Sequence, residues 1–349
     1  MDRAFEFVRR STSRIVIGAG IEARLPQLLR ESGAQRMVLV YDEALQPLAQ
    51  RLLAALSTAK GLPVHGGESL KTLTAIADMV GRLRAVNADR STTLLALGGG
   101  TVTDFTGFLA SIYLRGVPFI ACPTTTLAMC DAALGGKNGV DFDGRKNELG
   151  TIRQPELIVA DTAWLQTLPD PMFREGFVEA VKKAAVLDAG HFTRLEQLAP
   201  LLHQRDAAAA TEAIDMAVAM KMAVVLADEG ESDRRRWLNF GHTIGHALES
   251  LAAGALRHGE CIAIGMLAEC RAAANVVPPA VFTRLHDVLA GLGAPTTFPR
   301  AFADADRLWS LAGTDKKARG DHVPMIVPTA IGTGIVAELT RARLAVAIA

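Results

Sequence analysis

The fold of this chain is decided by one stretch, residues 93–100, which reads TLLALGGG. A short apolar run that ends in glycines is typical of a buried β-strand. A helical segment follows, so the stretch predicts a strand that turns through glycines into a helix. Backbone N–H groups and a helix N-terminus can then approach a phosphate. A tight structural turn explains these glycines equally well, because their spacing is not GxGxxG.

Similar apolar runs occur on both sides of this stretch. They lie at residues 13–17, 36–41, 119–122 and 157–160. An amphipathic helical pattern at residues 21–32 ends near Gly33, and this alternation of strands and helices predicts a parallel sheet covered on both faces.

Beyond residue 161 the pattern becomes helical. The helical stretches are residues 174–187, 207–228, 242–253, 260–275 and 281–292, and the next strand-like run is at 325–327. We therefore predict an α/β, Rossmann-like NAD-binding domain at residues 1–165. A mostly α-helical domain that binds metal and substrate is predicted at residues 166–349.

Composition excludes several classes of protein. The 349 residues suffice for two domains, and 37 Lys plus Arg balance 37 Asp plus Glu. Such a neutral chain has no basic surface for nucleic acid or an acidic membrane. No apolar stretch predicts a signal peptide or a membrane span, and the four cysteines lack metal-ligand spacing. We expect buried, reduced thiols and a cytoplasmic protein.

Several polar residues near strand ends are candidates for binding a nucleotide. Asp42 follows a strand, where it could bind a ribose hydroxyl or cap a helix. Glu68 and Lys71 lie in a polar segment and could equally form a surface pair. Thr124 and Thr125 follow another strand, so their hydroxyls could cap a helix or contact a ligand.

A glycine-rich polar stretch, residues 131–147, contains Asp131, Lys137, Lys146 and Asn147. We expect a loop here. Lys137 follows two glycines, so an ammonium group and open backbone could bind one anion together.

The strongest local chemistry surrounds three histidines. His242 and His246 are four residues apart and share a helix face, and His258 follows shortly after. Glu179 is the obvious carboxylate partner, since a catalytic zinc commonly has three protein ligands. A surface salt bridge to Lys183 is the alternative explanation for Glu179. The residues alone do not decide between a His242–His246 pair and a set of Glu179, His242 and His258.

The motifs taken together resemble one family. In chain order they are GESLK at 67–71, GGGTVTDFTGF at 98–108, PTTTLAMCD at 123–131, LGGK at 134–137, RKNELG at 145–150, GFVEAVK at 176–182, NFGHTIGHALE at 239–249 and HGE at 258–260. Their order and spacing resemble the 3-dehydroquinate synthase family of sugar-phosphate cyclases, over nearly the whole chain.

This resemblance implies a role for each matching residue. Metal ligands are implied at Glu179, His242 and His258, with His246 in the site but not a ligand. Catalytic roles are implied for Lys182, His246, Arg235, Asn239, Asp131 and Lys137. Substrate contacts are implied for Arg115, Lys146, Asn147, Lys221, Glu231, Lys316 and Lys317. Contacts to NAD are implied for Asp42, Glu68, Lys71, Gly98, Gly99, Gly100, Asp104, Thr124, Thr125, Lys146 and Asn147.

The resemblance also implies an activity and a partner. The family converts 3-deoxy-D-arabino-heptulosonate 7-phosphate to 3-dehydroquinate and phosphate, in the shikimate pathway, with NAD and a divalent metal, zinc or cobalt. Arg115 occupies the position of an arginine that reaches the neighbouring subunit's site, so a homodimer is implied.

Five departures from the family pattern keep other substrates open. They are Ala132, Ala133, Asn138, Asp141 and Glu148. A cyclase of secondary metabolism, acting on an amino analogue or another heptulose phosphate, is the alternative. A metal-dependent polyol dehydrogenase is less favoured, because Gly107 and Glu179 differ from that pattern. A non-catalytic binding protein is disfavoured by the complete residue set.

Overall fold

The structure, a computed structural model, describes residues 11–230, 234–313 and 322–349. It divides into two compact units. The first comprises Met1–Pro123 and Gly135–Asp161, and the second comprises Thr124–Leu134 and Thr162–Ala349. The functional boundary that the sequence places at residue 165 stays a prediction.

The first unit is built on a six-stranded sheet in the order β1-β8-β5-β4-β2-β3. The strands are β1 (Arg14–Gly18), β2 (Arg36–Asp42), β3 (Ala59–Val64), β4 (Thr92–Gly98), β5 (Phe119–Pro123) and β8 (Leu157–Asp161). Neighbouring strands pair in parallel, which confirms the predicted parallel sheet. Strand β4 is buried along its whole length, as its apolar run predicts.

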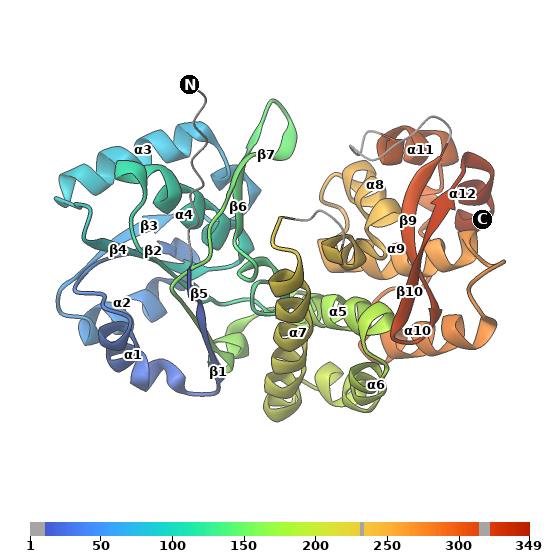
Figure 1. The fold of residues 1–349 in the computed structure, drawn as a ribbon, viewed down its shortest axis with the longest axis horizontal. Coiled ribbons are helices and arrows are strands. Elements are labelled where there is room, and N and C mark those ends of the chain that lie inside the picture. The colour runs from blue at the N-terminus through green and yellow to red at the C-terminus, as the bar shows by residue number, and fades with distance from the viewer. Residues whose placement is uncertain (1–10, 231–233, 314–321) are drawn as a thin grey trace, which may run out of the picture. The chain divides into compact units, whose positions relative to one another are not determined.

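Helices cover both faces of this sheet. They are α1 (Leu25–Glu31), α2 (Gln46–Ala55), α3 (Leu73–Ala85) and α4 (Gly100–Ile112). Helices α3 and α4 lie on one face, and α1 and α2 lie on the other (Figure 1). The sequence did not predict β3, because Gly61 and Pro63 interrupt its apolar pattern. Both residues are tolerated here because β3 is an edge strand.

The polar stretch at 131–147 is not the loop that the sequence predicts. It forms most of an antiparallel hairpin, β6 (Lys137–Phe142) and β7 (Arg145–Ile152), which packs on α4. Gly107 on α4 permits this contact, since a Cβ there would lie 2.0 Å from Asn138 Oδ1. The hairpin escapes prediction because Val140 is its only apolar buried position; Asn138 and Gly139 are also buried, and β7 has no buried position.

The second unit is mostly helical, as predicted. Its helices are α5 (Asp170–Leu187), α6 (Ala189–His203), α7 (Ala207–Ala227), α8 (His242–Ala252), α9 (His258–Ala272), α10 (Pro279–Gly291), α11 (Ala305–Gly313) and α12 (Arg341–Ile348). The hairpin β9 (Val323–Ala330) and β10 (Thr333–Leu339) completes the unit. Gly176 on α5 has no room for a side chain, since a Cβ would lie 2.2 Å from the carbonyl carbon of Thr126.

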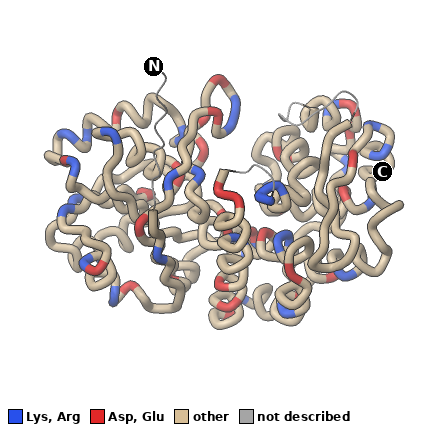
Figure 2. The backbone as a smooth tube through the Cα atoms, in the orientation of Figure 1, with Lys and Arg blue, Asp and Glu red and all other residues tan. Residues whose placement is uncertain are grey.

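The distribution of charged residues and the state of the cysteines agree with what the composition predicts. Acidic and basic residues are spread over both units (Figure 2). Within the described ranges, no helix is both long and apolar enough to span a bilayer. The four cysteines are free and buried. Burial raises the pKa of the Cys122 thiol to about 12, so this thiol is unreactive at neutral pH.

Candidate metal and nucleotide sites

A buried carboxylate in the second unit faces two imidazoles. Glu179 lies in the middle of α5 with 1% of its side chain exposed. Its Oε1 atom is 3.6 Å from His242 Nε2 and 3.7 Å from His258 Nε2. His242 and His258 are the first residues of α8 and α9, so three helices bring these groups together.

The second nitrogen of each imidazole has its own partner. His242 Nδ1 is 3.1 Å from the Phe240 carbonyl oxygen, and His258 Nδ1 is 2.9 Å from Glu249 Oε2. These contacts fix the rings with Nε2 directed at Glu179, and metal-binding histidines are oriented in this way.

The donor set fits a divalent metal. Both carboxylate oxygens of Glu179 are buried; Oε1 faces the two imidazoles, and Oε2 contacts Lys182 Nζ. Burial raises the pKa of Glu179, but Lys182 and the imidazoles hold it well below its usual value. An ionised carboxylate beside two imidazole nitrogens is a set of ligands that zinc or cobalt accepts.

His246 enlarges the cluster. The ligand atoms of His242, His246 and His258 lie within 4.8 Å of one another, and His246 is the exposed member. The side chains of the three-histidine set therefore lie close together, as do those of Glu179, His242 and His258. The second set uses the buried Oε1 atom of Glu179, which faces both His242 and His258, and this favours it.

Lysines surround the other side of Glu179. Lys182 Nζ contacts Glu179 Oε2, and Lys183 Nζ lies 3.9 Å from the same atom. Lys183 is fully buried, so the explanation of Glu179 as half of a surface salt bridge is wrong. Helix α5 is buried around most of its circumference at this point, and the i,i+4 spacing alone gave no indication of that.

Lys183 also contacts Asp131, which lies on a π-helical turn, Ala128–Ala132. Lys183 Nζ is 2.8 Å and Lys221 Nζ is 3.0 Å from Asp131 Oδ1. Burial opposes ionisation of Asp131, but these two lysines hold its pKa well below the usual value. Burial lowers the pKa of Lys221 to about 8. Asp131, Lys182, Lys221 and Glu179 thus form one charged network.

Other predicted substrate residues of this unit lie around the short helix Arg234–Asn239. Arg235 is buried, its guanidinium donates to the Glu229 carbonyl oxygen at 2.8 Å, and its backbone N–H donates to Asp228 at 2.9 Å. Asn239 ends the helix and is partly exposed. Glu231, Lys316 and Lys317 lie outside the described residues.

The first unit brings together a separate polar cluster. Lys71 Nζ donates to Asp104 Oδ2 at 2.9 Å and to Asn147 Oδ1. Lys146 Nζ lies 3.9 Å from Glu68 Oε1. Five residues that the resemblance links to NAD, from three separate segments, therefore lie close together.

The glycine run lies beside this cluster in the chain. Gly98 ends β4, Gly99 is the N-cap of α4, and Gly100 begins the helix. A Cβ at Gly98 would lie 2.7 Å from Val102 Cβ, so a side chain is excluded there. Packing thus demands one glycine, and the helix N-terminus still offers N–H groups to an anion.

The remaining candidates are more isolated. Asp42 accepts the Ala44 N–H at 3.0 Å, so its role as a helix cap is real. Thr125 likewise accepts the Ala128 N–H at 3.1 Å, and Thr124 is buried. Lys137 is exposed at the start of β6, and Arg115 is exposed with a φ of 70°.

Sequence reasoning missed two residues of the metal cluster. The sequence indicates Lys183 only as a surface partner of Glu179, and it gives Glu249 no role. A signal for Glu249 exists, because it follows His242 by seven residues and so lies on the same face of α8.

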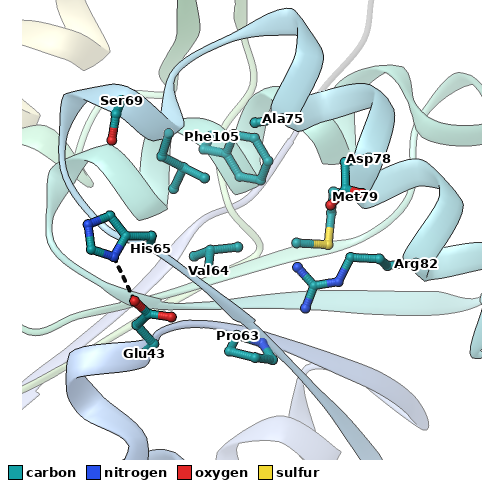
Figure 3. Close-up of a pocket in the computed structure, with 11 residues that line it drawn as sticks. Glu43, Pro63, Val64, His65, Ser69, Ala75, Asp78, Met79, Arg82 and Phe105 are labelled. Atoms are coloured by element: carbon teal, nitrogen blue, oxygen red, sulfur yellow. Dashed lines mark hydrogen bonds and ion pairs between the residues drawn. The ribbon is translucent and has the colours of Figure 1, made fainter.

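Two cavities lie away from these clusters. One, of about 280 Å³, lies in the first unit between β3 and α3, where His65 contacts Glu43 at 2.6 Å (Figure 3). The other, of about 550 Å³, lies in the second unit beside Trp237 and Met220. None of the predicted site residues that the structure describes lines either cavity.

Comparison with known proteins agrees with the sequence motifs. The family model for the 3-dehydroquinate synthase N-terminal domain matches residues 61–175, and that for the C-terminal domain matches residues 176–318. The 3-dehydroquinate synthase of Latilactobacillus sakei is 39% identical over 90% of this chain and 88% of its own length. That of Pyrobaculum neutrophilum is 36% identical over 94% of this chain and 92% of its own length.

Solved structures show the same fold. A 2-epi-5-epi-valiolone synthase from Streptomyces hygroscopicus with NAD⁺ and Zn²⁺ bound superposes with a TM-score of 0.87, at 28% identity over 99% of this chain and 98% of that chain. A 2-deoxy-scyllo-inosose synthase complexed with carbaglucose-6-phosphate, NAD⁺ and Co²⁺ gives 0.86, at 25% identity and 95% coverage of both chains. This chain belongs to the 3-dehydroquinate synthase family.

Proposed function

We propose that this chain converts 3-deoxy-D-arabino-heptulosonate 7-phosphate into 3-dehydroquinate and phosphate. NAD and a divalent metal, zinc or cobalt, are its proposed cofactors. One observation carries the proposal: a buried, ionised Glu179 faces His242 and His258 on one side and Lys182 on the other. The names of the full-length relatives support the substrate, and the bound groups of the related cyclase structures support the cofactors.

The cofactors and the protein divide the work. When bound, NAD takes up and returns a hydride, and the metal polarises the ring hydroxyl as a Lewis acid. Glu179, His242 and His258 would hold the metal. Lys71, Asp104 and Asn147 would position the nucleotide, with the α4 N-terminus favouring its phosphates.

The protein's own groups then bind and orient the substrate. Lys182 and Lys221 provide ammonium groups in a buried setting, where attraction to a carboxylate or phosphate is stronger than in water. Asp131 accepts hydrogen bonds from hydroxyl groups of the substrate. Lys137, Lys146, Asn147 and Arg235 are assigned to phosphate. His246, as the exposed imidazole of the cluster, is assigned to proton transfer.

The direct test is an assay of the purified protein with NAD⁺, zinc and the heptulosonate phosphate. Phosphate release with 3-dehydroquinate and no net NADH is the expected result. If folded, zinc-loaded protein does not convert this substrate but converts an amino analogue, the amino analogue is the substrate instead. Net NADH without phosphate would instead establish a dehydrogenase.

The anion contacts have a test of their own. Lys137→Ala should raise KM for the substrate by on the order of tenfold, because one charge-assisted bond is lost. Unchanged KM and kcat would remove Lys137 from the phosphate site. The homodimer inferred through Arg115 and the cytoplasmic location are also proposals. Ultracentrifugation at micromolar concentration tests the homodimer.

A further inference from the structure

A second buried carboxylate lies near the histidines but contacts none of the proposed ligands. Glu269 is on α9, and its side chain is fully buried. Its Oε2 accepts the Gly241 N–H at 2.8 Å, and its Oε1 accepts the Ile244 N–H at 3.0 Å. Both donors belong to the start of α8, so one helix supplies the cap of another.

The start of α8 needs such a cap. Its N-cap residue is Gly241, which has a φ of 78° and no side chain to accept the first free N–H groups of the helix. Buried N–H groups without partners are costly. Glu269 meets this need by accepting two of these N–H groups, and His242 is the first residue of the helix that it caps. Burial raises the pKa of Glu269 to about 8, so the cap acts through its hydrogen bonds.

The two helices also meet backbone to backbone. A Cβ at Gly265 on α9 would lie 2.1 Å from the Gly241 carbonyl oxygen, and one at Gly245 on α8 would lie 3.0 Å from the Cys261 carbonyl oxygen. Packing at this distance leaves little freedom for sliding. Because α8 begins at His242 and α9 begins at His258, the same contact sets the separation of the two imidazoles.

We propose that Glu269 is a positioning residue of the metal centre, which fixes His242 relative to His258 by capping α8 from α9. This inference rests on the proposed role of these histidines as metal ligands. Among the described residues, no hydrogen bond or ion pair joins Glu269 to the side chain of a proposed metal ligand or substrate residue. Its effect is transmitted through the backbone of Gly241 and Ile244.

The test compares two substitutions in the whole protein. Glu269→Gln keeps one acceptor oxygen of similar reach, whereas Glu269→Met fills the space with none. We expect zinc affinity, measured by competition with a chelating dye, to fall by about tenfold for Gln and up to about 100-fold for Met. Cys270→Ala, at the next buried position of α9, is the matched control and should bind zinc within about twofold of the native protein.

The readouts separate positioning from general destabilisation. Zinc affinity and the urea midpoint of the zinc-free protein are measured for each variant. Native affinity in Glu269→Gln and Glu269→Met would refute the proposal. So would an affinity loss in Cys270→Ala that matches theirs at an equal loss of stability. If Glu269→Met does not fold, Glu269→Gln alone decides. Zinc titration requires no turnover, so a native protein that binds zinc but lacks cyclase activity would refute the proposed substrate and leave this inference standing.

Discussion

Replacing Lys183 by methionine should destabilise the second unit by about 2–3 kcal/mol. Lys183 is fully buried, and its Nζ donates to the Cys130 carbonyl oxygen at 3.1 Å and to Asp131 Oδ1 at 2.8 Å. Removing one member of a buried ion pair costs about 3–5 kcal/mol, because the remaining charge stays buried.

Two features reduce that cost here. Asp131 is 27% exposed and keeps Lys221 at 3.0 Å, so its carboxylate is not left alone. Methionine also fills the space of the lysine stem without the cost of burying an ammonium group. The expected cost therefore lies at or below the lower end of that range, at about 2–3 kcal/mol.

Urea unfolding of the purified variant measures this change. Lys60→Met is the matched control, because Lys60 is exposed on β3 and the same substitution there should change stability by less than about 0.5 kcal/mol. If Lys183→Met were as stable as Lys60→Met, the buried network around Asp131 would not contribute as argued.

Three further outcomes are expected. Glu179→Gln should lower zinc affinity by at least about tenfold, since the carboxylate loses its charge, and full zinc content after dialysis would refute Glu179 as a ligand. Substrate affinity should fall as pH rises through about 8, where Lys221 loses its proton because burial lowers its pKa from 10.5; Lys221→Arg, which stays charged, should abolish that fall, and an unchanged profile would contradict the assignment. Gly176→Ala should destabilise by about 1–3 kcal/mol or prevent folding, because its Cβ would overlap the Thr126 backbone at 2.2 Å, and a native melting temperature would show that α5 can shift.

The parallel sheet and the long helices could be predicted because burial leaves a periodic record in the sequence. Strand β4 is buried on both faces, so its apolar run is continuous. The β6–β7 hairpin leaves no such record. Its bends depend on positive φ at Gly144 and Asn147, and Asp141 holds Asn147 by accepting its N–H at 2.7 Å. These are contacts between polar residues, which a search for apolar periodicity does not detect.

The choice between ligand sets shows where a sequence stops being informative. Spacing along α8 treats His242 and His246 as equals, because i and i+4 share a helix face. The structure adds the burial of Glu179, whose Oε1 lies 3.6 Å from His242 Nε2 and 3.7 Å from His258 Nε2. That burial follows from the packing of α5 against α7 and α9. A lysine one turn after Glu179 predicts a surface pair if α5 is peripheral and a buried charge network if α5 is central. Because α5 is central, the carboxylate is desolvated and its demand for a cation is strong, and this demand supports a metal centre at the meeting point of α5, α8 and α9.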